Sequence, residues 1–239
     1  LISLYNLYPS ATIIGLPSQG YSSGQSMSLM EEIAAKTLPP GTGYEWTAMS
    51  YQEKEVGSQI YFVFALALDT LGAERVESVI GVEPSGDPFN SIRLNADNHP
   101  FNAMVNAGAI ACSGLLHADK GDGAFDYIRH ALGRFAGREL DVDEAVYASE
   151  SATGDRNRAI GYLLRTNSVI AENVPAVLDV YFRQCAILVT ARDTAVMAAT
   201  LANRGINPLT GEQVVTPYAI ARTLSVMTSS GMYDFAGEW

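Results

Sequence analysis

The sequence is poor in cysteine, in basic residues and in long apolar runs. Its two cysteines, Cys112 and Cys185, both lie in apolar surroundings, which predicts buried thiols rather than a disulfide framework. The 15 lysines and arginines are scattered among 26 acidic residues, and the net charge is −11. We therefore expect no basic patch that follows phosphates, and no nucleic-acid partner. The longest apolar run, Ile60–Leu68, is less than half of the roughly 20 residues that a membrane-spanning helix needs, so we predict no membrane span.

Histidine is also scarce, and this argues against a metal site. His99, His117 and His130 show no pairing at helical spacing and have no cysteine or carboxylate at ligand spacing. The glycines form neither of the two common phosphate-binding loops. We therefore expect no metal and no cofactor. The first residues contain no basic segment followed by an apolar one, so we expect no signal peptide and a cytoplasmic location.

What the sequence does contain is mostly helical periodicity. Of its residues, 48% are hydrophobic and 17% charged, a balance typical of a folded domain. A short strand is expected at residues 11–15. The pattern predicts helices at 103–116, 122–135 and 155–165, and others that begin near 173, 190 and 216. Thr190 and Asp193 have the spacing of a capping box, in which two side chains satisfy the free amides of a helix start.

Four polar residues within largely apolar segments are candidates for chemistry. Asn106 interrupts the small-residue segment 103–116, where an unpaired buried amide costs a few kcal/mol. Pattern alone favours an amide that satisfies neighbouring backbone. Glu150 has the alternative of a loop carboxylate near a helix start. Tyr181 and Tyr233 have the alternative of core residues with a hydrated hydroxyl. Taken singly, each residue is better explained by the structural alternative.

Together these residues fall within segments that resemble one family, in the same order and at the same spacing. The segments are 81–91 (Gly-Val-Glu-Pro-Ser-Gly-Asp-Pro-Phe-Asn-Ser), 106–110 (Asn-Ala-Gly-Ala-Ile), 149–160, 178–185, 189–205 and 231–234. They resemble the serine-dependent glutaminases, the fold relatives of serine β-lactamases. The resemblance covers residues 69–239. It implies an α+β fold of the β-lactamase/transpeptidase-like glutaminase type, mostly helical as retained here and truncated at both ends.

The resemblance implies hydrolysis of L-glutamine to L-glutamate and ammonia, and it assigns the substrate-binding positions. These are Asn106, Glu150, Asn157, Tyr181 and Tyr233. The residue types suit the ligand, because an ammonium group favours a carboxylate such as Glu150, while a carboxylate and an amide favour neutral donors. Tyr233 would also lie near the reacting centre, where a phenol can help to move protons. An intact member is expected to form homo-oligomers.

The chain departs from the family at the catalytic motif. The family acts through Ser-x-x-Lys, in which the lysine takes the serine proton so that the oxygen can attack the amide carbon. Counting back from Gly72, these two positions fall on Gly57 and Ile60. Neither residue can act as nucleophile or base. We therefore predict that no nucleophile and no base are retained, and that the chain is inactive as a hydrolase.

Residues 1–66 resemble a different family, the resistance-nodulation-division (RND) efflux transporters. Segments 5–10, 30–34 and 43–53 are similar to the transporters' periplasmic porter region, and Ile60–Leu68 to the first half of the membrane helix that follows it. The resemblance predicts a chimera joined near residues 63–69, with a transporter-like fragment at 1–66 and an incomplete glutaminase domain at 67–239. Two alternatives to a glutaminase remain: a fragment of an RND transporter, or a glutamine-binding remnant without catalysis. In such a hybrid, helices including 103–116 are expected to expose apolar faces.

Overall fold

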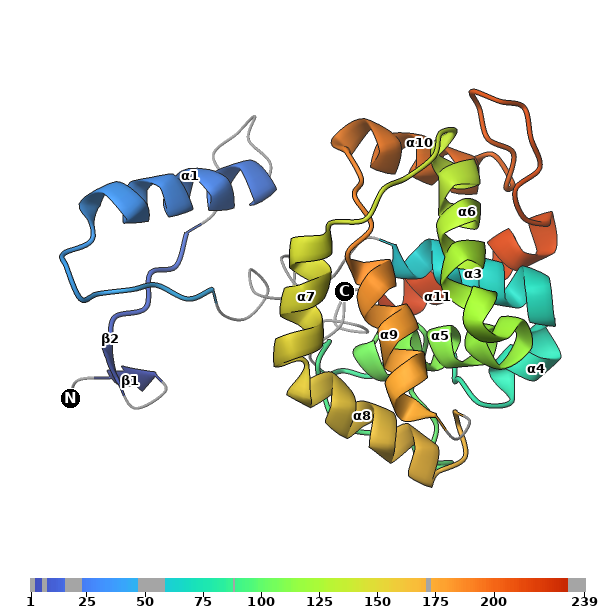
Figure 1. Ribbon diagram of the computed structural model, residues 1–239, viewed down its shortest axis with the longest axis horizontal. Helices are drawn as coiled ribbons and strands as arrows, with labels where there is room; N and C mark the ends of the chain where they lie inside the picture. Colours follow the sequence, from blue (N-terminus) through green and yellow to red (C-terminus); the bar gives the residue numbers. More distant parts are fainter. Residues whose placement is uncertain are drawn as a thin grey trace. The chain divides into compact units, whose positions relative to one another are not determined.

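The computed structural model describes residues 3–5, 8–15, 23–46, 59–87, 89–170 and 173–231. The chain divides into two compact units, Leu1–Glu55 and Val56–Trp239. In Figure 1 the described part of the first unit is drawn in blue, and that of the second unit in colours from cyan to red. The boundary between the units precedes the junction predicted at residues 63–69. The predicted boundary at residue 66 concerns where the two resembling sequences join, and it stays a prediction.

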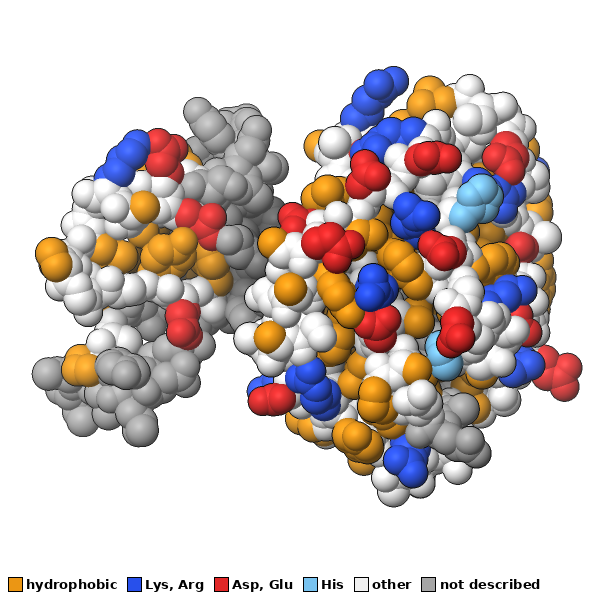
Figure 2. All heavy atoms as spheres, in the orientation of Figure 1, with side chains coloured by type: hydrophobic (Ala, Val, Ile, Leu, Met, Phe, Trp, Pro, Cys, Tyr) orange, Lys and Arg blue, Asp and Glu red, His pale blue; other side chains and the backbone are white. Residues whose placement is uncertain are grey.

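The first unit contains a two-stranded hairpin and one helix. Strand β1 (Ser3–Tyr5) pairs antiparallel with β2 (Tyr8–Ser10), and α1 runs over Ser23–Thr37, ending before the two prolines at 39–40. The strand predicted at residues 11–15 is wrong, because that segment forms no ladder with either strand. None of the side chains described in this unit is buried. Figure 2 shows hydrophobic side chains on the surface of α1.

The second unit is built from helices joined by short connections. They are α3 (Ile60–Leu71), α4 (Ala73–Glu77), α5 (Asn106–Lys120), a 3-10 turn (Gly121–Gly123), α6 (Ala124–Ala136), α7 (Glu144–Thr153), α8 (Asp155–Thr166), α9 (Val174–Cys185), α10 (Ala191–Ala202) and α11 (Pro217–Ser230). Within the described part of this unit, β-pairing is limited to two isolated bridges, Val142 with Ile187 and Ile206 with Gln213. The expectation of a mostly helical domain is confirmed.

Helix α5 lies at the centre of the second unit. It contacts α3, α6, α8 and α9, and every residue from Asn106 to Leu116 is buried. Glycine allows this close packing, because a Cβ on Gly114 would lie 2.6 Å from the Cγ2 atom of Ile170. The expectation that segment 103–116 exposes an apolar face is therefore wrong. The surrounding helices cover the segment on all sides.

Helix α3 uses the apolar run at the predicted junction as core. From Ile60 to Leu68, every side chain except Tyr61 is buried. The helix packs against α5, α6 and α11, and the ring of Phe62 lies 5.2 Å from that of Phe135. A segment that resembles half of a membrane helix is thus a buried helix of a globular core. Short apolar helices serve either purpose, because both environments select for apolar side chains.

Several helix boundaries follow the predicted signals. Thr190 and Asp193 form the expected capping box, with the Thr190 side chain bonded to the Asp193 amide and the Asp193 carboxylate bonded to the Thr190 amide. Thr216 caps α11, and Pro217 occupies its first position. Asn173 caps α9 in the same way. These caps fix the start of each helix, and for α9 they fix where Tyr181 lies.

Candidate functional site

Three of the predicted site residues meet at one point of the second unit. The side-chain nitrogen (Nδ2) of Asn106 lies 2.8 Å from the side-chain oxygen (Oδ1) of Asn157. The hydroxyl of Tyr181 lies 3.0 Å from Oδ1 of Asn106. These residues come from the first turn of α5, the first turn of α8 and the middle of α9. Segments far apart in sequence thus bring together the residue types that a small polar ligand requires.

A fourth residue, Asn90, completes this amide cluster. Its Oδ1 accepts a hydrogen bond from Nδ2 of Asn106 at 2.6 Å. Its backbone oxygen accepts another from Arg156 at 3.0 Å. Asn90 lies within the family-like segment 81–91 but is not among the predicted site residues, because a loop asparagine has no periodicity that marks it. We call Asn90, Asn106, Asn157 and Tyr181 the amide cluster.

The loop before α5 is held in place by backbone hydrogen bonds. The amide of Gly81 donates to Pro100 at 2.8 Å, and that of Glu83 donates to Phe101 at 3.0 Å. Asn102 donates to the Glu83 carbonyl at 2.7 Å. The amide of Asn106 donates to the Phe89 carbonyl at 3.0 Å. The segment that carries Asn90 is therefore fixed directly against the start of α5.

Glu150 lies in the last turn of α7 and is half-buried. The loop alternative for this residue is therefore wrong. Gly154 follows α7 and begins α8, so Glu150 and Asn157 lie on either side of one sharp corner. A Cβ on Gly154 would lie 2.7 Å from the Glu150 carbonyl oxygen and 2.5 Å from the ring of Phe182. Only glycine fits where α7, α8 and α9 meet, and this close approach holds Glu150 and Asn157 on adjoining turns.

The alternative explanations for Asn106 and Tyr181 can now be compared with their contacts. The side-chain amide of Asn106 bonds to side chains and not to backbone. Tyr181 is 6% exposed, and its hydroxyl bonds to an amide oxygen. Tyr233 and Gly57 lie outside the described residues. Ile60 opens α3 with 4% exposure, so an aliphatic side chain occupies the position that the resemblance gives to the lysine.

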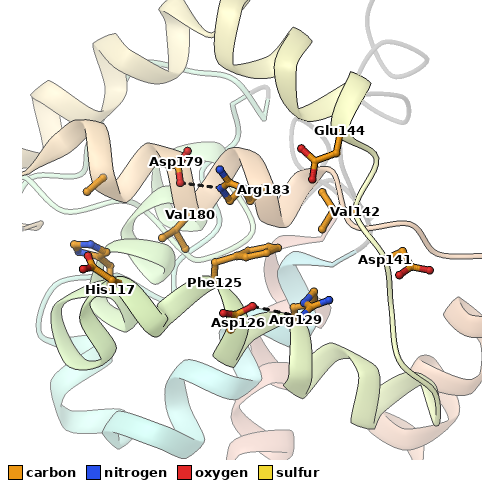
Figure 3. A pocket seen from close by; sticks show the side chains of 12 residues that line it. His117, Phe125, Asp126, Arg129, Asp141, Val142, Glu144, Asp179, Val180 and Arg183 are labelled. Atoms are coloured by element: carbon orange, nitrogen blue, oxygen red, sulfur yellow. Dashed lines mark hydrogen bonds and ion pairs between the residues drawn. The ribbon is translucent and has the colours of Figure 1, made fainter.

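A cavity in the second unit lies away from the amide cluster. Its volume is about 690 Å³, and Figure 3 shows it between α6, α9 and the segment before α7. Asp179 pairs with Arg183 at 2.9 Å, and Asp126 with Arg129 at 3.4 Å. The Tyr147 hydroxyl also donates to Asp179, and this bond raises the pKa of Tyr147. None of the predicted site residues that the structure describes lines this cavity. Nor do the described residues contain a group of three side chains able to hold a metal ion.

Comparison with known proteins decides the family. The family model described as Glutaminase matches residues 58–239. This chain belongs to the glutaminase family. A second model, the AcrB/AcrD/AcrF family, matches residues 1–72. The two matched ranges overlap at 58–72, which contains the predicted junction, so the predicted resemblance to two families is confirmed.

The relatives of this glutaminase-family chain agree with its fold. It is 82% identical to Glutaminase 1 of Bradyrhizobium diazoefficiens over 178 residues, which is 74% of this chain and 29% of that protein. The crystal structure of Mglu in its glutamate form is 42% identical with a TM-score of 0.71, covering 76% of this chain and 42% of that one. A Bacillus glutaminase structure is 31% identical with a TM-score of 0.71, covering 75% and 61%. The predicted α+β glutaminase fold, β-lactamase-like and mostly helical, is confirmed.

The matches cover only part of the related proteins. The glutaminase-family chain spans less than a third of the length of two curated relatives, Glutaminase 1 and Glutaminase 2 of Bradyrhizobium diazoefficiens. Within the described ranges, no helix is long and apolar enough to cross a membrane. The match to the AcrB/AcrD/AcrF family is a match in sequence over residues 1–72.

Proposed function

We propose that the second unit binds L-glutamine through the amide cluster and does not hydrolyse it. The observation that carries this proposal is the convergence of Asn106, Asn157 and Tyr181. They are separated by 51 and 75 positions in the sequence, yet they share one hydrogen-bond network. Side-chain amides and a phenol recognise a carboxylate and an amide without a net charge of their own. Glu150, on the adjoining turn, would hold the ammonium group.

The absence of hydrolysis rests on the catalytic motif. Amide hydrolysis by this family's chemistry needs a hydroxyl nucleophile and a base that takes its proton. The resemblance places these groups at Gly57 and Ile60, and neither side chain has a proton to give or a lone pair to accept one. Tyr233 stays a prediction for proton transfer. A phenol alone does not replace an activated nucleophile.

Relatives support the ligand. The similar Mglu structure was determined in a glutamate form, so a protein of this fold takes up the product of glutamine hydrolysis. Hydrolysis of L-glutamine itself is the second candidate function, and family membership favours it. The two candidates differ in one measurable quantity, the release of ammonia.

The test combines calorimetric titration with an ammonia assay on the purified full chain. We expect heat of binding with L-glutamine and no ammonia above a protein-free control. Tyr181→Phe removes only the hydroxyl bonded to Asn106, so we expect affinity to fall about tenfold, the equivalent of one hydrogen bond. Tyr162→Phe makes the same chemical change at a residue that is 49% exposed, so we expect it to bind like the wild type.

Two outcomes would overturn the proposal. Ammonia release that Tyr181→Phe reduces would show that the chain is a working hydrolase. A wild-type chain that folds but gives no heat with L-glutamine would show that the amide cluster is not a ligand site. The cytoplasmic location, the homo-oligomeric state and the lack of a nucleic-acid partner stay predictions.

A further inference from the structure

We propose that Asn90 orders the amide cluster: it fixes the orientation of the Asn106 amide and, together with Asn157, presents a side-chain NH₂ donor to the ligand. This inference rests on the proposed function, because it assumes that the cluster receives L-glutamine. Asn90 is not among the site residues that the family resemblance assigned. Its role follows from the direction of each hydrogen bond in the cluster.

The direction is set at Tyr181. Oδ1 of Asn106 can only accept, so the Tyr181 hydroxyl must donate to it. The Nδ2 group of Asn106 then has two protons, and both have acceptors. One bond goes to Oδ1 of Asn90 at 2.6 Å and the other to Oδ1 of Asn157 at 2.8 Å. Both donor protons of Asn106 are therefore used inside the cluster.

A flipped Asn106 amide would be unstable in this setting. Its oxygen would face the oxygens of Asn90 and Asn157, and its nitrogen would face the phenol. Two hydrogen bonds would become contacts between acceptors. Removing the acceptor at residue 90 takes away one of these two constraints and leaves a donor proton of Asn106 unpaired in a residue that is 2% exposed.

The same network orients Asn90 and Asn157 toward a ligand. Because their oxygens accept from Asn106, their nitrogens point away from it. Neither nitrogen bonds to another described residue, and neither is sealed from solvent, since the one buried side-chain atom without a partner in the described part is Oε1 of Gln59. The cluster thus offers two NH₂ donors. Donors of this kind select an acceptor group, and the carboxylate of L-glutamine is the strongest acceptor on that ligand.

Asn90 is held firmly enough to act in this way. Arg156, in the first turn of α8, donates to its backbone oxygen, and the preceding residue, Phe89, accepts from the Asn106 amide. Phe89 is also buried, with 5% exposure. The backbone at 89–90 is therefore fixed between the starts of α5 and α8, the two helices that carry Asn106 and Asn157.

The experiment uses three variants of the full chain and two readouts. Asn90→Ala removes the acceptor, Asn90→Asp keeps a side-chain oxygen acceptor, and Asn167→Ala removes a distant asparagine that donates to the Leu163 carbonyl. The first readout is L-glutamine affinity by calorimetry. The second is hydrogen exchange of the Asn106 side-chain NH₂ protons, followed by NMR in the ligand-free protein.

We expect Asn90→Ala to weaken L-glutamine binding at least tenfold and to speed exchange of the Asn106 NH₂ protons. Asn90→Asp should restore slow exchange, and Asn167→Ala should leave both readouts unchanged. The inference is wrong if Asn90→Ala binds within twofold of the wild type, or if its Asn106 exchange is unaltered. If Asn90→Ala does not fold, Asn90→Asp decides, because fast Asn106 exchange in that variant would also contradict the inference. Failure of the wild type to bind would instead refute the proposed function, since the exchange readout needs no ligand.

Discussion

At the scale of single residues, Asp193 shows how one carboxylate stabilises two elements. It accepts from the Thr190 amide at the start of α10 and from Arg138 after α6, at 2.6–2.8 Å. The hydrogen bond from Arg138 is the main reason that the pKa of Asp193 lies well below its usual range. A lowered folded-state pKa stabilises the protein above the unfolded pKa of about 3.9, and this stabilisation is lost as pH falls toward the folded value.

Asp193→Asn should therefore lower the free energy of unfolding by about 2 kcal/mol at pH 7, given that Arg138 is partly exposed. The deficit relative to the wild type should shrink progressively below about pH 4. Urea denaturation at pH 7 and at pH 3 measures both values. Asp126→Asn, at a carboxylate with 76% exposure, is the control and should change stability by less than about 0.5 kcal/mol. A deficit that is independent of pH would contradict this explanation.

The family resemblance selected residues that the fold brings together, but it did not select a residue whose role depends on a single contact. Asn106, Asn157 and Tyr181 were identified by resemblance, and the fold brings them together. Pattern alone preferred a structural role for Asn106 and Tyr181, because a single polar residue in an apolar segment has many explanations. Asn90 was missed since its importance lies in one side-chain contact across 16 positions, which no sequence period reveals.

At the scale of elements, the start of α5 depends on glycine at residue 108. A Cβ there would lie 1.9 Å from the Asn102 carbonyl oxygen and 2.7 Å from Cα of Ala103. Asn102 cannot easily retreat, because its side chain also bonds to Glu83 and Met104. Gly108→Ala should therefore cost about 3 kcal/mol of unfolding free energy, as overpacking of a rigid contact does.

The loss should also reach the amide cluster, because Asn106 lies two residues before Gly108. We expect Gly108→Ala to weaken L-glutamine binding as well as to lower the denaturation midpoint. Gly123→Ala is the matched control, since a Cβ there meets nothing within 4 Å. Loss of a glycine N-cap should cost at most about 1 kcal/mol. Equal stability of the two variants would show that the loop at 102–103 gives way.

Helices were predicted correctly where apolar side chains at helical spacing are buried. Helices α5, α6 and α8 to α11 bury one face or more, and their positions were expected from apolar spacing and caps. Helix α7 was not predicted, because none of its residues is buried and its apolar pattern is weak. Its one clear signal is Asp143, whose side chain accepts from the amides of Ala145 and Val146. Solvent-facing helices are recognised from caps rather than from core residues.

At the scale of the whole molecule, sequence origin and compactness divide the chain at different places. The AcrB/AcrD/AcrF match extends to residue 72, whereas the compact second unit begins at residue 56. The difference arises at α3, whose apolar residues are buried in the core of the second unit. Burial depends on apolar character and volume, so a helix that both family models match can serve as core of the second unit. The sequence predicts a junction near residues 63–69, but it does not predict that the helix at this junction is buried in the core of the second unit.

The buried core lies entirely within the second unit in the part of the chain that the structure describes, which predicts the result of a deletion. In the first unit, Ile13 and Ile14 are 80% and 90% exposed, and Leu29 is 51% exposed. A chain that lacks residues 1–55 should therefore keep the thermal transition of the full chain within roughly 3 °C, about 1 kcal/mol for a domain of this size. It should also aggregate less, because exposed apolar surface promotes association. Circular-dichroism melting and light scattering measure the two effects.

A deletion that extends through residue 71 supplies the control, because it also removes α3 and its eight buried side chains. Loss of that much apolar surface exceeds the net stability of an ordinary domain, so this shorter chain should show no cooperative transition. Retention of a transition without α3 would mean that this helix is dispensable and that the core closes without it. Loss of the transition on removing residues 1–55 alone would mean instead that the transporter-like segment contributes to the fold. Together, the two deletions show whether the cooperatively folding part of the chain requires residues 1–55, requires α3, or requires neither.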